Sequence, residues 1–198
     1  MLDSAASRVP LPALVEACVA AGADWVQVRE RALAGMALVA LTDDVRAAAT
    51  RGARAGAARV LVNRWLDVAL ATGADGVHLG GDAVTPAEAR ALLGASAWIG
   101  VSAHAPEEID PLSGASYAHL APIFAPLSKT SARPPLGLDA LRRAAARGLP
   151  VLAQGGVTPE RARAILDTGA AGVAVTGSVL AADDPAAAVR ALREALDG

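Results

Sequence analysis

Short apolar runs recur along the chain, and glycine and polar residues separate them. Four runs follow a Gly-Ala-x triplet: Trp25–Val28, Gly76–Leu79, Tyr117–Leu120 and residues 172–175. Each triplet follows a stretch of helical composition. Glycine there is typical of a residue that ends a helix, because it enters the left-handed region without a Cβ penalty. The pattern predicts four helix ends, each followed by a buried strand.

Three more apolar runs lie between these, at residues 59–63, 98–102 and 150–154. Helix starts follow some strands: Thr85-Pro86-Ala87-Glu88 is a capping box with proline at the first helical position, and Thr158-Pro159 repeats the cap and the proline. Seven strands in strict alternation with helices predict an α/β fold of the (β/α)8 TIM-barrel type. An open doubly wound sheet is the alternative, but neither a dinucleotide fingerprint nor a P-loop favours it.

The count of strands leaves the first strand of such a barrel unassigned. The four Gly-Ala-x strands take the even-numbered places, and residues 1–12 contain no strand-like run. We therefore expect the first strand to be missing or truncated, with exposed edges on strands two and eight. A homodimer that covers this open edge is a further expectation. The length favours a single TIM-barrel domain over residues 1–198.

Composition narrows the classes of function. The chain is 54% hydrophobic, mainly through alanine, and only 3% aromatic, so the core must be rich in small aliphatic residues. The net charge of −2, with acids and bases interspersed, excludes a basic face for nucleic acid. Without a secretory signal or an 18-residue apolar span, we expect a cytoplasmic protein with no membrane contact. The single cysteine, Cys18, excludes an intrachain disulfide and is expected to be a buried small hydrophobe.

One lysine, Lys129, stands among seventeen arginines. It follows Ser128 in a loop flanked by proline, after an apolar run. A compact ammonium on a flexible stem offers something that the planar guanidinium does not, which suggests a functional role. Chance survival of a surface lysine is the alternative.

A phosphate site is predicted at the ends of the last two strands. Gly155-Gly156 ends strand seven, and Thr176-Gly177 ends strand eight. Loops after these strands form the recurrent phosphate cradle of the fold, and glycines allow backbone N–H groups to approach an anion. Simple turn glycines are the alternative.

A cationic rim with amide groups is predicted at the other strand ends. It consists of Gln27, Arg29, Asn63, Ser128 and Lys129. These residues suit a second anionic group beside a polar heterocycle, because charge-assisted hydrogen bonds would orient it. A solvated barrel mouth is the alternative.

Histidines and one acid complete the candidates for chemistry. His104, just after the strand at residues 98–102, is a candidate general acid or base, since imidazole titrates near neutrality. His78 and His119 follow buried runs, so we expect them to be packed or locally hydrogen-bonded. Asp82 is the one acid near the rim without a helical role. A single carboxylate is a weak metal signal, and no metal ligand is assigned.

From about residue 11 to residue 196, the chain resembles the thiamine phosphate synthase and thiazole tautomerase family, and seven segments carry the resemblance. They are WVQVRER at 25–31, VN at 62–63, GADGVHLG at 73–80, GVSAH at 100–104, PIF at 122–124 with SK at 128–129, PPLGL at 134–138, and GGVTP at 155–159. The family is a (β/α)8 barrel whose first strand ends in Thr-Asp, where only Leu2-Asp3 remains here.

The resemblance implies roles for individual residues. The synthases join a pyrimidine methyl diphosphate to a thiazole phosphate and release pyrophosphate with magnesium. Similarity assigns the thiazole phosphate to Gly156, Thr176 and Gly177. It assigns the pyrimidine diphosphate to Gln27, Arg29, Asn63, Ser102, Ser128 and Lys129.

Departures from the synthase pattern fall on the metal. Arg64 stands where the family has an aspartate, and the second metal aspartate would fall at Ala83, one position after Asp82. Pyrophosphate departure develops negative charge that magnesium neutralises in the synthases. We therefore expect a metal-independent, thiazole tautomerase-like enzyme without a cofactor, acting on a phosphorylated small molecule. His104 and Lys129 are then the catalytic candidates.

Two alternatives remain open. The first is a thiamine phosphate synthase that uses magnesium. The second is a non-catalytic protein that binds thiazole phosphate or has a regulatory role.

Overall fold

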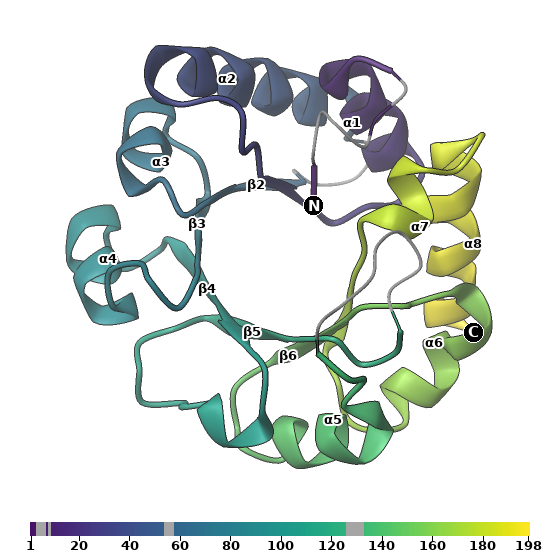
Figure 1. Cartoon of the computed structure of the whole chain (residues 1–198). Helices are drawn as coiled ribbons and strands as arrows, with labels where there is room; N and C mark the ends of the chain where they lie inside the picture. Colours follow the sequence, from purple (N-terminus) through teal and green to yellow (C-terminus); the bar gives the residue numbers. More distant parts are fainter. Residues whose placement is uncertain (3–6, 8, 54–57, 126–132) are drawn as a thin grey trace.

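The computed structural model describes residues 1–2, 7, 9–53, 58–125 and 133–198. Within them, seven parallel strands form one sheet in chain order, from β1 to β7 (Figure 1). The strands are β1 (Trp25–Val28), β2 (Arg59–Asn63), β3 (Gly76–Leu79), β4 (Trp98–Ala103), β5 (Tyr117–Leu120), β6 (Val151–Gln154) and β7 (Gly172–Ala174). The sheet curls around a common axis, so the structure is of the TIM-barrel type, as predicted.

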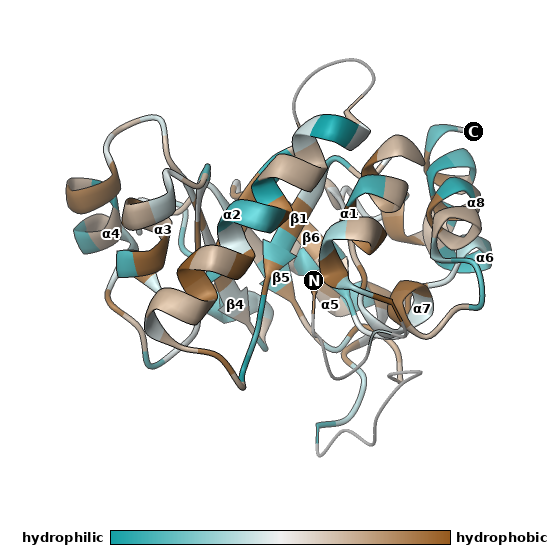
Figure 2. Ribbon diagram, turned by 90° about the horizontal axis from the view of Figure 1, so that it is seen from above, coloured by the Kyte–Doolittle hydropathy of each residue, from teal (hydrophilic) through white to brown (hydrophobic). Residues whose placement is uncertain are grey.

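Helices surround the curled sheet on its outer side (Figure 1). They are α1 (Leu11–Ala20), α2 (Gly35–Gly52), α3 (Leu66–Thr72), α4 (Pro86–Leu93), α5 (Gly137–Ala145), α6 (Pro159–Leu166), α7 (Gly177–Leu180) and α8 (Pro185–Asp197). Figure 2 shows hydrophilic and hydrophobic stretches side by side along α2 and α8, as expected of helices that cover a core. In the described part of the chain, every helix is too short or too polar to cross a bilayer.

The strand predictions are confirmed, with small differences at the ends. Strand β4 extends to Ala103, one residue beyond the predicted end, and β7 stops at Ala174, one residue before it. Thr85 accepts a hydrogen bond from the Glu88 amide, and the Glu88 side chain accepts one from the Thr85 amide, so the predicted capping box is present. The glycines that open all four Gly-Ala-x triplets have positive φ, between 60° and 110°.

The prediction of a helix before Gly114 is wrong. The segment between β4 and β5 contains only a short 3₁₀ helix, η2 (Pro106–Glu108), followed by turns. Pro106 and Pro111 lie five residues apart, and a proline inside a helix removes a donor and clashes with the preceding turn. Gly114 still turns the chain, with φ of 84°, although no α-helix ends there.

The first and last strands, β1 and β7, are not paired with each other. Leu2 forms an isolated parallel bridge with Val28, and its amide donates to the Gln27 carbonyl at 2.7 Å. The Met1 ammonium donates to the Val175 carbonyl at 2.9 Å, just after β7. Among the described residues, two residues therefore connect the ends of β1 and β7 where the eight-stranded pattern expects a strand.

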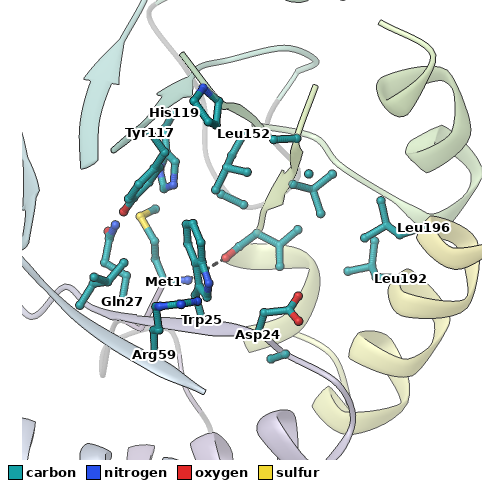
Figure 3. A pocket seen from close by; sticks show the side chains of 18 of the residues that line it. Met1, Asp24, Trp25, Gln27, Arg59, Tyr117, His119, Leu152, Leu192 and Leu196 are labelled. Atoms are coloured by element: carbon teal, nitrogen blue, oxygen red, sulfur yellow. Dashed lines mark hydrogen bonds between the residues drawn. The ribbon is translucent and has the colours of Figure 1, made fainter. Parts of the chain in front are cut away.

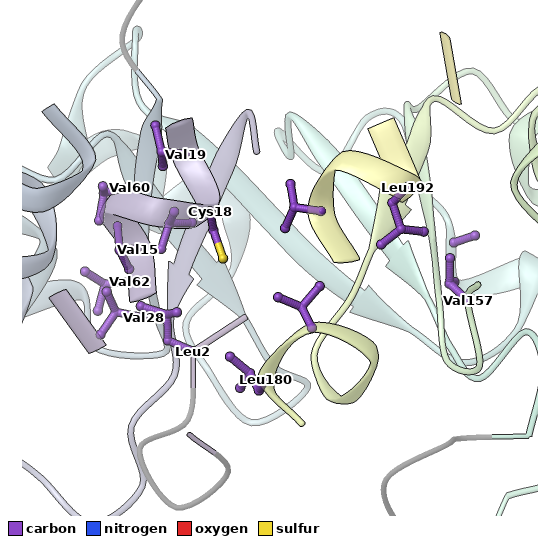
Figure 4. Close-up of a cluster of buried hydrophobic side chains, with 14 of the residues drawn as sticks. Leu2, Val15, Cys18, Val19, Val28, Val60, Val62, Val157, Leu180 and Leu192 are labelled. Carbon is purple, nitrogen blue, oxygen red and sulfur yellow. The ribbon is translucent and has the colours of Figure 1, made fainter. Parts of the chain in front are cut away.

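A large hydrophobic cluster joins the sheet to the helices (Figure 4). Leu2 belongs to this cluster, together with Val28 of β1 and Leu180 of α7. Cys18 of α1 is 8% exposed in the same cluster, and burial raises the pKa of its thiol to about 11. The prediction that Cys18 is a buried small hydrophobe is confirmed.

A cavity of about 680 Å³ lies between the unpaired strands (Figure 3). Its wall includes residues from the beginnings of the strands, among them Trp25, Arg59 and Tyr117, and α8 contributes Leu192 and Leu196. The cavity therefore extends from the amino-terminal half of the barrel into its interior. Its inner end reaches Gln27 and His119.

Candidate active site at the carboxyl ends of the strands

Gln27 and Asn63 lie next to each other on β1 and β2. The Asn63 side-chain amide donates to the Gln27 side-chain carbonyl, with 3.3 Å between Nδ2 and Oε1. Gln27 is 5% exposed, and its Nε2 is buried without a hydrogen-bond partner among the described residues. A buried, unsatisfied donor is unfavourable unless a ligand or water accepts from it. The structure thus brings two predicted rim residues together. The Gln27 side chain also acts on the Tyr117 hydroxyl and opposes the effect of burial, which raises the pKa of Tyr117.

His78 connects the next three strands. Its Nδ1 lies 3.1 Å from the Tyr117 hydroxyl, and its Nε2 lies 2.9 Å from the Ser102 hydroxyl. Burial, followed by the charge of Arg29, lowers the pKa of His78 to about 4, so the imidazole is neutral at pH 7. The prediction that His78 is locally hydrogen-bonded is confirmed. Because Ser102 is exposed, this contact holds a hydroxyl at the mouth of the barrel.

Gly100 makes the contact between His78 and Tyr117 possible. A Cβ built on Gly100 would lie 2.2 Å from Tyr117 Cζ and 2.5 Å from His78 Nδ1. The His119 ring stacks 4.3 Å from His78, and burial lowers its pKa well below the ordinary value. The sequence pattern did not identify Tyr117 as part of this network. Its place two residues before His119 on one strand was the available signal, since such residues share a face.

Arg29 follows β1 and is half-buried. Its positive charge contributes to the lowered pKa of His78, which indicates that it acts on the barrel interior. A cation there favours anionic ligands and a neutral imidazole.

His104 lies in the loop after β4, with 38% of its side chain exposed. Glu108 Oε2 accepts from the His104 amide at 2.8 Å and lies 3.8 Å from its Nδ1. Partial burial and the charge of Arg133 lower the pKa of His104, and Glu108 opposes them. The lowered pKa favours the neutral form of the ring. Its catalytic role stays a prediction.

The predicted phosphate loops lie side by side, because Gln154 of β6 is in register with Ala174 of β7. Gly155 and Gly156 have φ of 96° and 62°, and a Cβ on Gly156 would lie 2.4 Å from the Ala125 carbonyl oxygen. Close packing is therefore sufficient to explain glycine here, and phosphate binding stays a prediction.

The other phosphate-binding candidates, Thr176 and Gly177, lie at the start of α7. Thr176 Oγ1 is buried without a hydrogen-bond partner in the described part of the chain. An unpaired buried hydroxyl is unusual, and the role of Thr176 in phosphate binding stays a prediction. Two other predicted residues, Ser128 and Lys129, lie outside the described residues.

Arg64 directly follows Asn63 and has an unusual backbone conformation. Its φ is 69°, the only positive value among the described residues other than glycine. The turn is held by two hydrogen bonds of 2.9 Å, from the Arg64 amide to the His78 carbonyl and from the Trp65 amide to the Asn63 carbonyl. Such strain costs about 1–3 kcal/mol and is concentrated at functional sites.

The Arg64 guanidinium forms an ion pair with Asp82 in the loop after β3. Nη2 lies 2.7 Å from Oδ2, and the two side chains are 55% and 66% exposed. An exposed pair of this kind contributes about 0.2–1 kcal/mol, less than the backbone strain costs. Fold stability therefore does not explain arginine at this position. Arg64 and Asp82 are 18 residues apart along the chain, and this spacing gave no sign that they form an ion pair.

The magnesium ion implied by the synthase resemblance can be tested against these residues. Magnesium prefers carboxylate and other oxygen ligands. The carboxylate of Asp82 is instead bound to a guanidinium, and Ala83 offers no side-chain ligand. No group of three or more histidine, cysteine, aspartate or glutamate residues in the described ranges could hold a metal ion. The residues present do not fit the implied magnesium site.

Comparisons with known proteins match nearly the whole chain to one family. The family model for thiamine monophosphate synthase matches residues 2–179. The chain is 41% identical over 189 residues to the thiamine-phosphate synthase of Moorella thermoacetica, covering 93% of this chain and 88% of that protein. It is also 41% identical over 184 residues to the bifunctional ThiM/ThiE protein of Symbiobacterium thermophilum, covering 91% of this chain but 38% of that protein.

A solved structure extends the similarity to three dimensions. The thiamine phosphate pyrophosphorylase from Pyrococcus furiosus superposes with a TM-score of 0.83 at 27% identity, covering 98% of this chain and 93% of that one. The match includes the curled sheet and therefore the strand ends on which the candidate site stands. The chain belongs to the thiamine monophosphate synthase family.

Proposed function

We propose that this chain is a thiamine phosphate synthase, which joins a pyrimidine methyl diphosphate to a thiazole phosphate. The observation that carries the proposal is the 41% identity to a named thiamine-phosphate synthase over nearly the whole chain. The expectation of a thiazole tautomerase-like enzyme rested on the altered metal positions. The names of the relatives favour the synthase instead.

The proposed reaction is a substitution at the pyrimidine methylene carbon. The bond from that carbon to the diphosphate oxygen breaks, and its electron pair leaves with pyrophosphate. The thiazole nitrogen donates its lone pair to the same carbon and forms the new bond. No electrons are transferred to or from another molecule, so the protein must orient two substrates and stabilise the leaving anion.

The polar layer at the strand ends suits the pyrimidine substrate. Gln27 Nε2 is a buried donor without a described partner, and it can donate to a ring nitrogen. Asn63 fixes the orientation of this amide through the 3.3 Å hydrogen bond. The Ser102 hydroxyl, held by neutral His78, is available to the diphosphate. Arg29 and Lys129 would add positive charge.

The thiazole phosphate would bind at the last two strands. Gly156 would contribute its backbone N–H group, and Thr176 Oγ1 is a buried hydroxyl without a described partner. The beginning of α7 at Gly177 follows Thr176 directly, so its first backbone N–H groups would be available to the same phosphate.

The tautomerase is the second candidate, because one observation favours it. The Arg64–Asp82 pair stands where a diphosphate reaction would use a metal, and a tautomerase moves only a proton within a thiazole carboxylate phosphate. Arg29 would bind the carboxylate, and His104, with its lowered pKa, would carry the proton.

Formation of thiamine phosphate from the two synthase substrates tests the proposal. The reaction should be followed with the purified chain, once with magnesium and once with chelator, and folding should be checked by circular dichroism. Product formation would support the synthase. A folded protein that makes no product under either condition would contradict it, and conversion of thiazole carboxylate phosphate would then identify a tautomerase. Binding of thiazole phosphate without any turnover would identify a non-catalytic binder.

A further inference from the structure

We propose that Arg64 is a diphosphate-binding residue that supplies, from the protein itself, positive charge to the departing pyrophosphate. The inference rests on the proposed synthase function for its substrate. It starts from the misfit between the described residues and a magnesium site. Where the family implies a metal held by carboxylates, this chain has a guanidinium bound to one carboxylate.

The position of Arg64 places its charge at the predicted site. Arg64 directly follows Asn63, whose side chain contacts Gln27. The backbone amide of Arg64 donates to the carbonyl of His78. Asp82 belongs to the loop after the adjacent strand, β3. The carboxyl ends of parallel neighbouring strands share one rim, so the ion pair stands at the same mouth as Ser102.

The backbone conformation of Arg64 indicates that its side chain has a functional role. Glycine would adopt φ of 69° without strain, yet the chain has arginine. The exposed ion pair with Asp82 stabilises the fold by less than the backbone strain costs, so it does not explain why arginine stands here. A residue kept in a strained turn at the mouth of a barrel is a candidate for ligand binding.

Asp82 gives Arg64 a defined resting position. A guanidinium has five N–H donors, and a planar fork of two of them matches a phosphate group. The contact with Asp82 through Nη2 leaves the pair accessible to solvent. A diphosphate carries more negative charge than one carboxylate, so it can take over the guanidinium when it binds.

The contribution to the reaction follows from the charge balance. When the methylene carbon–oxygen bond breaks, the electron pair moves onto the pyrophosphate, and negative charge accumulates there. Arg64 keeps its proton throughout and stabilises this charge through hydrogen bonds that strengthen as it develops. The thiazole nitrogen supplies the electrons of the new bond, so no further reactant is needed.

Binding of pyrophosphate, measured by isothermal titration calorimetry in the presence of chelator, tests the inference without requiring turnover. Arg64→Gly is the most informative variant, because it removes the guanidinium and relieves the strained φ. Arg64→Lys keeps the charge but loses the fork. Arg51→Ala is the matched control, because Arg51 pairs with Glu16 at 2.8 Å with 54% of its side chain exposed, away from the strand ends.

We expect Arg64→Gly to weaken pyrophosphate binding about tenfold or more, the usual effect of losing a charge-assisted hydrogen bond. Its melting temperature should be unchanged or higher. Arg64→Lys should recover part of the affinity, and Arg51→Ala should bind as the wild type does. The same ranking is expected in kcat for thiamine phosphate formation.

Two results would overturn the inference. One is equal pyrophosphate affinity in the wild type and Arg64→Gly. The other is wild-type binding that requires magnesium. The two proposals can fail separately. Pyrophosphate binding that depends on Arg64 in a protein that makes no thiamine phosphate would support the anion site and contradict the synthase. Synthase activity that persists in Arg64→Gly would support the synthase and contradict the anion site at Arg64.

Discussion

The buried imidazole of His78 should make the stability of the protein depend on pH in a defined window. Its pKa is lowered from 6.5 to about 4 in the folded protein, mainly by burial. In the unfolded chain the imidazole is exposed and takes up a proton near its ordinary pKa. Between these two values the unfolded state therefore binds more protons, and the free energy of unfolding decreases as the pH falls.

The size of the effect follows from the pKa difference. A tenfold change in an ionisation equilibrium is worth about 1.4 kcal/mol, so His78 alone should account for about 3 kcal/mol. This contribution is complete above pH 6.5 and is lost as the pH falls to about 4. For a protein of this size, such a loss is a large part of the total stability, which is typically about 5–15 kcal/mol.

Urea unfolding followed by circular dichroism at pH 7, 5.5 and 4 provides the assay. The reference is His78→Gln, which cannot take up the proton. The wild type should lose about 3 kcal/mol more than this variant between pH 7 and pH 4. His119 remains in both proteins, so its own lowered pKa affects both slopes.

A direct titration gives a second readout. The His78 imidazole, followed by NMR, should stay neutral down to about pH 5, because its pKa is about 4. Equal pH dependence of the wild type and His78→Gln would refute the reasoning. So would an imidazole that titrates near 6.5, since it would mean that the ring is not buried as described.

Three further substitutions test separate parts of the structure. Gly100→Ala places a Cβ 2.2 Å from Tyr117 Cζ and should lower the free energy of unfolding by about 1–3 kcal/mol in urea; unchanged stability would contradict the close packing. Thr85→Ala removes the capping box of α4 and should cost about 1 kcal/mol in the same assay, and no loss would mean that the cap is not formed in solution. Lys129→Ala should weaken the binding of pyrophosphate in calorimetry while the melting temperature stays constant, and unchanged affinity would show that the single lysine is accidental.

Much of the fold could be predicted because its signals are local. Each Gly-Ala-x triplet begins with a glycine at positive φ, and each is followed by a strand. A buried strand can be predicted without knowing which strands pair with it, because a parallel strand covered on both faces is a continuous apolar segment in the sequence. The helix before Gly114 is the exception. There the composition indicated a helix, but Pro106 and Pro111 prevent one.

The candidate site could be predicted only in outline. The fold places strand ends at one rim, which is why Gln27, Asn63 and Ser102 were predicted to share a site. Their individual contacts were not predictable. His78 contacts Tyr117 and Ser102 from strands that follow it by 20 residues or more, and the contact depends on the space that Gly100 leaves.

The sequence alone thus determined the order of elements, the parallel sheet and the rim that carries the candidate site, because periodicity and glycine conformation act over a few residues. The tertiary structure decided the contacts across that rim. Arg64 and Asp82 are 18 residues apart, and only the neighbouring positions of β2 and β3 bring their charges to 2.7 Å. The lowered pKa of His78 has the same origin, since desolvation depends on everything that packs around a group and not on its neighbours along the chain.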